Sequence, residues 1–196
     1  MTKVYEHKLP VGKFELYNAR PNFDFTEVSQ VHGNHVLETN KSLKNNNQEA
    51  DGLYCLTHEF TPMAIKTADC LPICVCGEKG VALLHAGWRG VASNIFSLEN
   101  LKAIVPFYFF IGPAIAIENY EVQPDFKEHF SALDHCFTKR GQRIYFDLKG
   151  AAESLILHQF PSAQIEKSPM DTYSTPELHS FRLDKTKLRN WNIWQP

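Results

Sequence analysis

The sequence has neither a long apolar run nor an excess of charge of one sign. Its longest apolar run, around Ile104 to Ile111, contains Pro106 and is far too short to span a bilayer. The 20 Lys and Arg residues are spread along the chain and nearly balance the 22 Asp and Glu residues, so the formal net charge is −2. Nucleic acids and membrane surfaces attract clustered positive charge. We therefore expect no nucleic-acid partner and no membrane association.

We also expect neither a secretory signal nor a disulfide framework. His7 and Lys8 stand where a signal peptide would have its apolar centre. The five cysteines are odd in number, and Cys70, Cys74 and Cys76 crowd one short segment. In a secreted protein this pattern would leave one thiol unpaired, whereas in a cytosolic protein it indicates buried thiols and one reactive or metal-bound sulfur. We adopt the second interpretation and expect a cytoplasmic protein.

The composition is that of a globular protein. Hydrophobic residues make up 43% of the 196 residues and charged residues 21%, which is enough apolar surface for one domain spanning residues 1–196. No repeat occurs at a solenoid period. The polar stretch Asn40 to Gln48 predicts a solvated loop. Because no feature marks an association surface, we expect a monomer.

Strand-like and helix-like segments alternate along the chain. Short apolar runs bounded by Pro, Gly or charged turns predict strands, and apolar residues at helical spacing predict helices. Glu78-Lys79-Gly80 predicts a tight turn that joins two strands into a hairpin. The interleaved order predicts an α/β protein. The expected strands are Met63–Ile65, Leu71–Cys76, Val81–His85, Phe107–Ile111 and Gln164–Lys167, and the expected helices are Val91–Leu101, Phe126–Leu133 and Leu148–Phe160.

Three short segments place a histidine or a cysteine beside small residues at the end of an apolar run. A side chain at such a position can point into a cleft. Two imidazoles and a thiolate suit Zn²⁺, and a catalytic zinc commonly keeps three protein ligands and an open fourth position. The segments are Gln30-Val31-His32-Gly33, Thr67-Ala68-Asp69-Cys70-Leu71-Pro72 and His85-Ala86-Gly87-Trp88-Arg89-Gly90.

The spacing of these residues leaves other interpretations open, because no short zinc pattern such as Cys-x-x-Cys or His-Glu-x-x-His occurs. Cys70 would otherwise be a buried small hydrophobe, His85 a core histidine bonded to a carbonyl, and His32 a loop histidine. Asp69, beside the thiol, either orients a ligand or bound water or caps a turn. Arg89 offers a planar fork for phosphate or a developing anion, or pairs with a carboxylate at the surface.

These segments resemble the bacterial YfiH/YlmD-type laccase-domain family, whose members have been called polyphenol oxidases and, later, purine nucleoside phosphorylases. The resemblance runs from about Gln30 to Arg189 in the family's motif order. It includes Asp51-Gly52, Ile111-Gly112-Pro113-Ala114-Ile115 and Tyr120-Glu121-Val122. It implies a single laccase-like domain, a mixed β-sheet sandwich flanked by helices.

In that family the histidine of the first segment, the cysteine of the second and the histidine of the third bind zinc. Carried over by position, the resemblance implies that His32, Cys70 and His85 hold Zn²⁺ in this chain. The catalytic residues that we expect are Asp69, Arg89, Cys70 and His85. Cu²⁺ would bind the same three ligands in vitro, because copper exceeds zinc in intrinsic affinity for such sites.

The chain departs from the family in three places. The arginine- and glycine-rich segment upstream of the first motif is missing or shortened, and Arg20 is a loose replacement for its charge. A C-terminal Cys-Thr of the family corresponds to Asp171-Thr172, and a Phe-Phe-Ser-Tyr-Arg-Arg-like stretch corresponds to Leu178–Leu183. These departures bear on the range of substrates rather than on the zinc ligands.

The resemblance implies a zinc-dependent purine nucleoside enzyme whose partners are a nucleoside and phosphate. It would phosphorolyse adenosine, inosine or methylthioadenosine, and a linked activity would deaminate adenosine. One alternative is a cysteine hydrolase or amidase in which His85 activates Cys70, for example in editing cell-wall precursors. Another is laccase-like oxidation of phenols. We disfavour oxidation because multicopper oxidases need clustered His-x-His pairs, which the nine histidines do not form.

Overall fold

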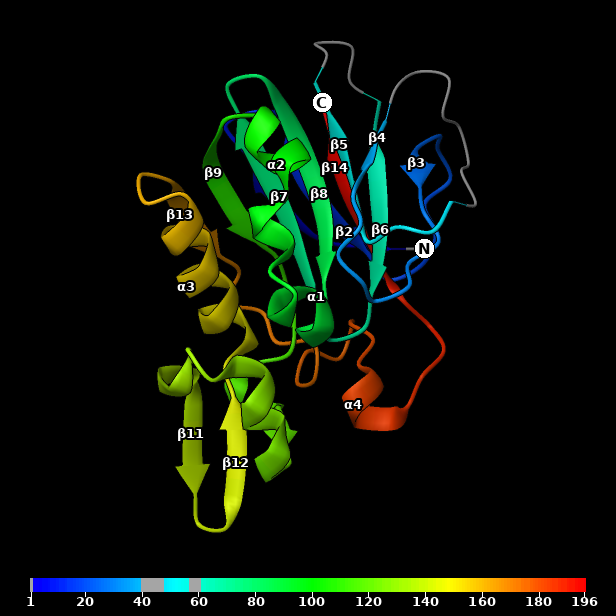
Figure 1. Ribbon diagram of the computed structural model, residues 1–196. Helices are drawn as coiled ribbons and strands as arrows, with labels where there is room; N and C mark the ends of the chain where they lie inside the picture. The colour runs from blue at the N-terminus through cyan, green and yellow to red at the C-terminus, as the bar shows by residue number, and fades with distance from the viewer. Residues whose placement is uncertain (1, 40–47, 57–60) are drawn as a thin grey trace.

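The computed structural model describes residues 2–39, 48–56 and 61–196, which are built around a central six-stranded sheet (Figure 1). Its strand order is β13-β9-β7-β8-β5-β4. The inner strands pair antiparallel, whereas β13 and β4 lie parallel to their neighbours at the two edges. The loop predicted at Asn40 to Gln48 lies, apart from Gln48, outside the described residues. The bounds are β4 Leu37–Glu38, β5 Gly52–Cys55, β7 Leu71–Gly77, β8 Gly80–Ala86, β9 Pro106–Ile111 and β13 Gln164–Lys167.

The hairpin of β7 and β8 forms the centre of this sheet, with Gly77 paired to Gly80 across the predicted turn. Side chains alternate between two cores: Ile73 and Val75 face one of them, and Cys74 and Cys76 face the other. A strand that is buried on both faces has a continuous apolar sequence. This is why the short apolar runs of the sequence identify these strands correctly.

A five-stranded sheet packs against one face of the central sheet. Its order is β1-β2-β14-β6-β3, so that β14, from the C-terminal end of the chain, lies between β2 and β6. Phe14, Trp194, Leu83 and Phe110 belong to the buried core between the two sheets. The apolar-run criterion predicts only β6 of this sheet, because the other strands mix polar and apolar residues or are very short. The bounds are β1 Lys3–Lys8, β2 Lys13–Tyr17, β3 Thr26–Glu27, β6 Met63–Thr67 and β14 Asn190–Gln195.

Helices cover the other face of the central sheet (Figure 1). The helix predicted over Leu148–Phe160 is confirmed as α3. It is capped at its N-terminus by Asp147, whose carboxylate accepts a hydrogen bond from the Gly150 N–H at 2.8 Å. The single helix predicted over Val91–Leu101 is wrong. Asn94 has a φ of 49°, in the left-handed region that ends helices. The chain therefore forms three short elements, α1 Trp88–Ala92, η1 Ile95–Ser97 and α2 Glu99–Ala103, before α3 Leu148–Gln159.

A small three-stranded sheet of order β10-β12-β11 extends from one end of the molecule (Figure 1). Phe137 and Phe146, on two strands of this sheet, pack together with Phe126. The helix predicted over Phe126–Leu133 is instead a 3-10 helix that begins two residues earlier. The bounds are η2 Ile117–Asn119, β10 Glu121–Val122, η3 Pro124–Phe130, η4 Asp134–Cys136, β11 Phe137–Arg140, β12 Arg143–Phe146 and α4 Phe181–Asp184.

Mixed sheets combined with helices make this an α/β structure, as the sequence predicts. Among the described residues, the helices are too short or too polar to cross a bilayer.

A buried carboxylate in β2 makes the stability of the fold depend on pH. Glu15 is 2% exposed, and burial on its own would raise its pKa above the ordinary 4.5. Hydrogen bonds from Lys13, Tyr17 and Lys3 outweigh burial and lower the pKa of this carboxyl to about 2. A depressed carboxyl pKa stabilises the folded state above the unfolded pKa, and that stability is lost as pH falls from 4.5 towards 2.

Glu15→Gln is therefore expected to lower the free energy of unfolding by about 2–3 kcal/mol at pH 7, and the difference from the wild type should vanish near pH 2. Urea unfolding at a series of pH values measures this. Glu6→Gln is the matched control, because Glu6 also contacts Lys3 but is exposed, and should cost less than about 0.5 kcal/mol. A pH-independent difference for Glu15→Gln would contradict the account.

Candidate metal centre

The pairing of β5 with β8 places an aspartate against a histidine at the end of the central sheet. Gly52 pairs with Leu84, so the preceding Asp51 lies opposite His85. The two side chains lie on the same face, and His85 Nδ1 is 2.8 Å from Asp51 Oδ1. Both residues are buried. Because the carboxylate accepts from Nδ1, the ring is fixed in the tautomer that leaves Nε2 as the metal-binding nitrogen.

The pairing of β7 with β8 brings the cysteine to the same place. Leu71 pairs with Ala86, so Cys70 lies opposite Gly87, one residue beyond the strand ends. A Cβ atom at Gly87 would lie 3.1 Å from Cys70 Sγ and 3.5 Å from His32 Cδ2. Glycine thus leaves room for the sulfur and the imidazole to approach each other.

The loop that carries His32 is held by the same aspartate. The backbone N–H of His32 donates to Asp51 Oδ1 at 2.9 Å, and that of Gly33 donates to Asp51 Oδ2 at 2.6 Å. His32 has a φ of 60°, a left-handed conformation uncommon outside glycine. Gly90 allows the loop to pack closely, because a Cβ there would lie 2.8 Å from the Gly33 carbonyl oxygen. One carboxylate therefore positions both histidines.

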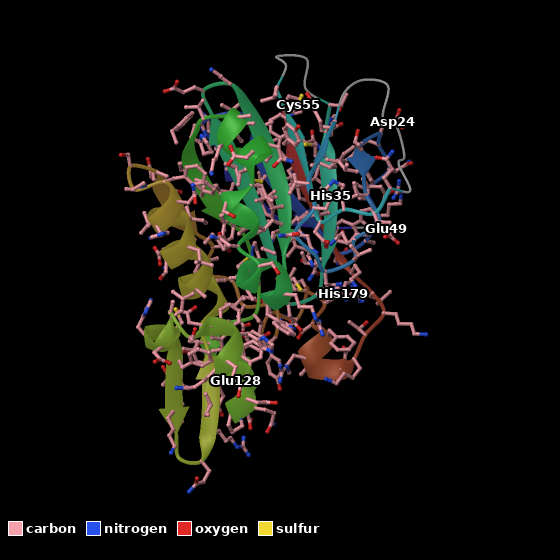
Figure 2. The ribbon with its side chains drawn as sticks, viewed as in Figure 1. Asp24, His35, Glu49, Cys55, Glu128 and His179 are labelled. Atoms are coloured by element: carbon pink, nitrogen blue, oxygen red, sulfur yellow. The ribbon has the colours of Figure 1, made fainter. Side chains whose placement is uncertain are left out.

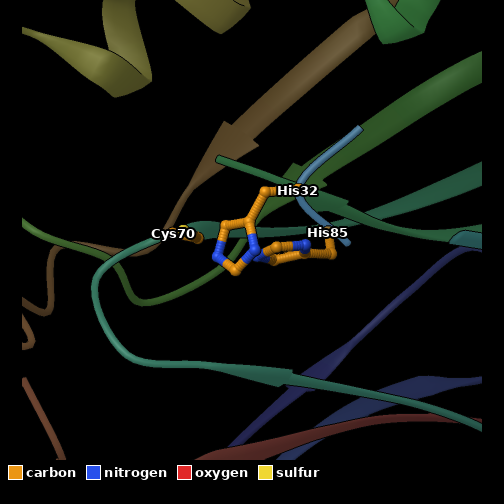
Figure 3. A group of neighbouring side chains, drawn as sticks. All are labelled: His32, Cys70 and His85. Carbon is orange, nitrogen blue, oxygen red and sulfur yellow. The ribbon is translucent and has the colours of Figure 1, made fainter. Parts of the chain in front are cut away.

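Three side chains converge at this point (Figure 3). Ligand atoms of His32, Cys70 and His85 all lie within 4.8 Å of one another. In the part of the chain that the structure describes, this is the one group of His, Cys, Asp or Glu side chains placed to hold a metal ion. His85 is buried whereas His32 is exposed, so the cluster opens to solvent on one side. Two nitrogens and a sulfur with an open side fit a tetrahedral metal that keeps one position for an exchangeable ligand.

The electrostatics of the cluster favour a thiolate. Burial on its own would raise the pKa of Cys70, but hydrogen bonds and charge interactions with His32 and His85 lower it to about 6. Burial would likewise lower the pKa of His85, but its contacts with Asp51 and Cys70 raise it to about 9. The pKa of Asp51 is held below its ordinary value, against the effect of burial, by His85 and the two backbone N–H groups. A thiolate is the form of cysteine that binds metals and attacks electrophiles.

A cleft of about 740 Å³ opens over the cluster. Its walls include all three of His32, Cys70 and His85. It is also strongly cationic, because Asp69 is the acidic residue among its walls and the basic side chains there are Lys66, Arg89, Arg182, Lys187 and Arg189. Such a wall favours an anionic or phosphate-bearing ligand beside the cluster.

The predicted residue Arg89 lies at the start of α1 and is exposed within this cleft. Its guanidinium carbon lies 4.4 Å from the centre of the Trp88 ring. Trp88 in turn packs against Phe126 at 5.2 Å between ring centres. The motif therefore places a cation at the mouth of the cleft, on a ring that is fixed by packing.

The predicted residue Asp69 also lines the cleft, and it holds the C-terminal part of the chain in place. Asp69 has a φ of 89°, and its two carboxylate oxygens accept from Thr172 Oγ1 at 2.8 Å and from the Arg182 N–H at 2.7 Å. Through these hydrogen bonds Asp69, the neighbour of Cys70, holds a segment that lies more than 100 positions later in the sequence.

That C-terminal segment, residues 178–189, contributes four residues to the cleft and is anchored at several points. His179, labelled in Figure 2, bonds to the Asn18 carbonyl through Nε2 at 2.8 Å and exchanges two hydrogen bonds with Asn190. Ahead of this segment, Asp171 accepts from the Ala116 N–H and from Asn119 Nδ2 at 2.9 and 2.7 Å. The cleft wall is therefore fixed to both ends of the chain.

Sequence reasoning identifies the cluster but assigns no role to Asp51. The sequence does mark Asp51 as a candidate for this supporting role, because Asp51-Gly52 leads directly into a strand. A charged residue that is 0% exposed needs several partners, yet its partners come from residues 32, 33 and 85, which only the sheet register brings together.

Fold and site together define an α/β protein with a candidate three-ligand metal centre beside a cationic cleft. The chain belongs to the family described as "Multi-copper polyphenol oxidoreductase laccase", whose model matches residues 15–192. This confirms the family resemblance that the sequence motifs predict.

Relatives and solved structures agree with this assignment. The chain is 28% identical over 213 residues to "Purine nucleoside phosphorylase RC0672" of Rickettsia conorii, with 100% of this chain and 81% of the relative aligned. It is 32% identical over 176 residues to "Purine nucleoside phosphorylase YfiH" of Escherichia coli, with 83% and 70% aligned. The crystal structure of YlmD from Geobacillus stearothermophilus superposes with a TM-score of 0.77 at 27% identity, covering 87% of this chain and 73% of that chain.

Proposed function

We propose that this chain is a zinc-dependent purine nucleoside enzyme that phosphorolyses adenosine, inosine or methylthioadenosine and also deaminates adenosine. The observation that carries the proposal is the juxtaposition of the His32–Cys70–His85 cluster with a cationic cleft of about 740 Å³. The names of the related proteins from Rickettsia conorii and Escherichia coli support the same substrate class. A cytoplasmic location and a monomeric state stay predictions.

In this proposal His32, Cys70 and His85 hold the zinc. Bound zinc supplies Lewis-acid chemistry in the cleft. Asp51 keeps His85 in the metal-binding tautomer and holds the backbone of the His32 loop, so that the ligands are arranged before the metal binds. Cys70 is ready to ligate near neutral pH because its pKa is lowered to about 6.

The cations of the cleft bind and orient phosphate. Arg89 is the main anchor, because its planar guanidinium is exposed at the cleft wall and can bind two phosphate oxygens at once. Asp69 acts as a positioning residue in this scheme. Its carboxylate holds the Arg182 backbone, and Arg182 is itself a cation of the cleft.

Arg89→Gln is expected to raise the KM for phosphate at least about tenfold, with a smaller change in the KM for adenosine, because a charge-assisted bidentate contact is lost. The measurement follows adenine, inosine and hypoxanthine released from adenosine with and without phosphate. Arg140→Gln is the control, since Arg140 lies in β11 outside the cleft. No turnover of any purine nucleoside by the zinc-loaded wild type would overturn the proposal.

A second candidate function is cysteine hydrolase or amidase activity, favoured by the low pKa of Cys70 beside His85. Stoichiometric zinc on Cys70 would count against it, and turnover of amide or thioester substrates by metal-free protein would favour it. We do not propose phenol oxidation, because the described residues form one cluster of three ligands and multicopper chemistry needs more.

A further inference from the structure

Tyr120 is almost fully buried, yet no described residue forms a hydrogen bond with its hydroxyl group. The residue follows η2 and is 9% exposed. Its ring packs edge-on against Phe126 and Phe146, at 6.2 and 6.0 Å between ring centres. Buried hydroxyl groups in folded proteins nearly always have a hydrogen-bond partner, so an unpaired one indicates a partner that is not part of the chain.

The hydroxyl group of Tyr120 faces the cationic cleft. Tyr120 lines this cleft, and its oxygen is not sealed within the core. Burial raises the pKa of Tyr120 above its usual value, so the hydroxyl group keeps its proton. The charges that act on this pKa belong to four other residues that line the same cleft: Cys70, Arg182, Asp69 and Arg89. The wall of the cleft therefore presents a neutral O–H donor among these charged groups.

The guanidinium group of Arg182 lies beside Tyr120 and is held in place. Its central carbon is 5.1 Å from the centre of the Tyr120 ring, and Nη1 donates to the Glu121 carbonyl at 2.9 Å. The backbone N–H of Arg182 is anchored separately, by Asp69 at 2.7 Å. No carboxylate of the described residues forms an ion pair with Arg182 or with Arg89. The positive charge of Arg182 and most of its five N–H donors thus remain for a ligand.

We infer that Tyr120 and Arg182 form a subsite for the phosphate of the reaction, in which the hydroxyl and guanidinium groups both donate hydrogen bonds to phosphate oxygens. The inference rests on the proposed function and adds a neutral donor and a second cation to Arg89. Phosphate has several acceptor oxygens and binds planar guanidinium groups in a bidentate manner. A neutral nucleoside would leave the charges of the two arginines without a partner, whereas phosphate complements them.

The test is calorimetric titration of the zinc-loaded protein with inorganic phosphate. Tyr120→Phe keeps the packed ring and is expected to raise the Kd for phosphate at least about tenfold, because a hydrogen bond to a charged acceptor is lost. Since no described residue bonds to the hydroxyl group, the Tm of the phosphate-free variant should stay within about 2 °C of the wild type.

Tyr145→Phe is the matched control for this variant. Arg140 lies 5.0 Å from the centre of the Tyr145 ring, as Arg182 lies beside Tyr120, but Tyr145 does not line the cleft. The Kd for phosphate should therefore stay within about twofold of the wild type.

Arg182→Gln is a second variant, and it keeps the backbone N–H that donates to Asp69. It is also expected to raise the Kd for phosphate at least about tenfold, because a charge-assisted contact is lost. Unchanged phosphate binding in either variant, a large fall in the Tm of Tyr120→Phe, or no phosphate binding by the wild type would overturn the subsite. Purine nucleoside turnover by the wild type would then leave the proposed function standing. Without such turnover the proposed function fails, and the phosphate titrations alone decide the subsite.

Discussion

Cys70→Ala is expected to reduce bound zinc from about one atom per chain to less than about one tenth, and to lower nucleoside turnover at least about a hundredfold. The reason is geometric, because Cys70 supplies the sulfur of a cluster whose three ligand atoms lie within 4.8 Å of one another. Mass spectrometry of the purified protein measures the metal, and the adenosine assay measures turnover.

Cys74→Ala is the control for this experiment. Cys74 is a buried thiol only four positions further on, but it faces the core between the two sheets. Removing it should cost about 1 kcal/mol of stability and leave the zinc content unchanged. A Cys70→Ala protein that keeps both its zinc and its activity would contradict the metal assignment. Turnover of amide or thioester substrates by a wild type without zinc, abolished in Cys70→Ala, would instead favour Cys70 as a nucleophile.

Asp51→Asn is expected to weaken zinc binding about 10–100-fold although Asp51 is not itself a ligand. Its Oδ1 accepts from His85 Nδ1 and from the His32 N–H, while its Oδ2 accepts from the Gly33 N–H at 2.6 Å. An amide retains one acceptor and turns the other into a donor, which then faces an N–H group. Because Asp51 is fully buried, stability should also fall by about 2–3 kcal/mol.

Competition with a chelator measures the zinc affinity of this variant, and thermal unfolding of the metal-free protein measures its stability separately. Asp134→Asn serves as the control, because the Asp134 carboxylate is 79% exposed and should change neither quantity. If Asp51→Asn bound zinc as tightly as the wild type, the carboxylate would have a role in folding alone.

Much of the central sheet is predictable from the sequence, and the reason is its burial on both faces. Strands β7 and β8 have continuous apolar sequences because sheet and helices cover them. The segment after β8 is less predictable. Its apolar spacing is helical, but the left-handed conformation of Asn94 breaks it into three pieces. Strand β14 is not predicted from the sequence, because its burial depends on pairing with β2 and β6, which are both far away in the sequence.

For the site, the sequence predicts the three candidate ligands but not the residues that support them. The family motifs identify His32, Cys70 and His85, and the structure brings these three together. The support that Asp51 gives to His85 depends on the register between β5 and β8. The contact of Asp69 with Arg182 joins a motif residue to a segment 113 positions later. Long-range pairings of this kind are not contained in local sequence.

The position of β14 has a consequence for how the molecule is made. Within the described part of the chain, the N-terminal hairpin of β1 and β2 joins the rest of its sheet through β14 alone. While a ribosome is still translating residues before Asn190, the inner edge of β2 and the neighbouring edge of β6 have no strand between them. Unpaired strand edges are sites where chains associate wrongly. Nascent chains of this protein therefore expose the unpaired edges of β2 and β6 until Gln195 has emerged. A chaperone that shields the N-terminal hairpin would act during that interval.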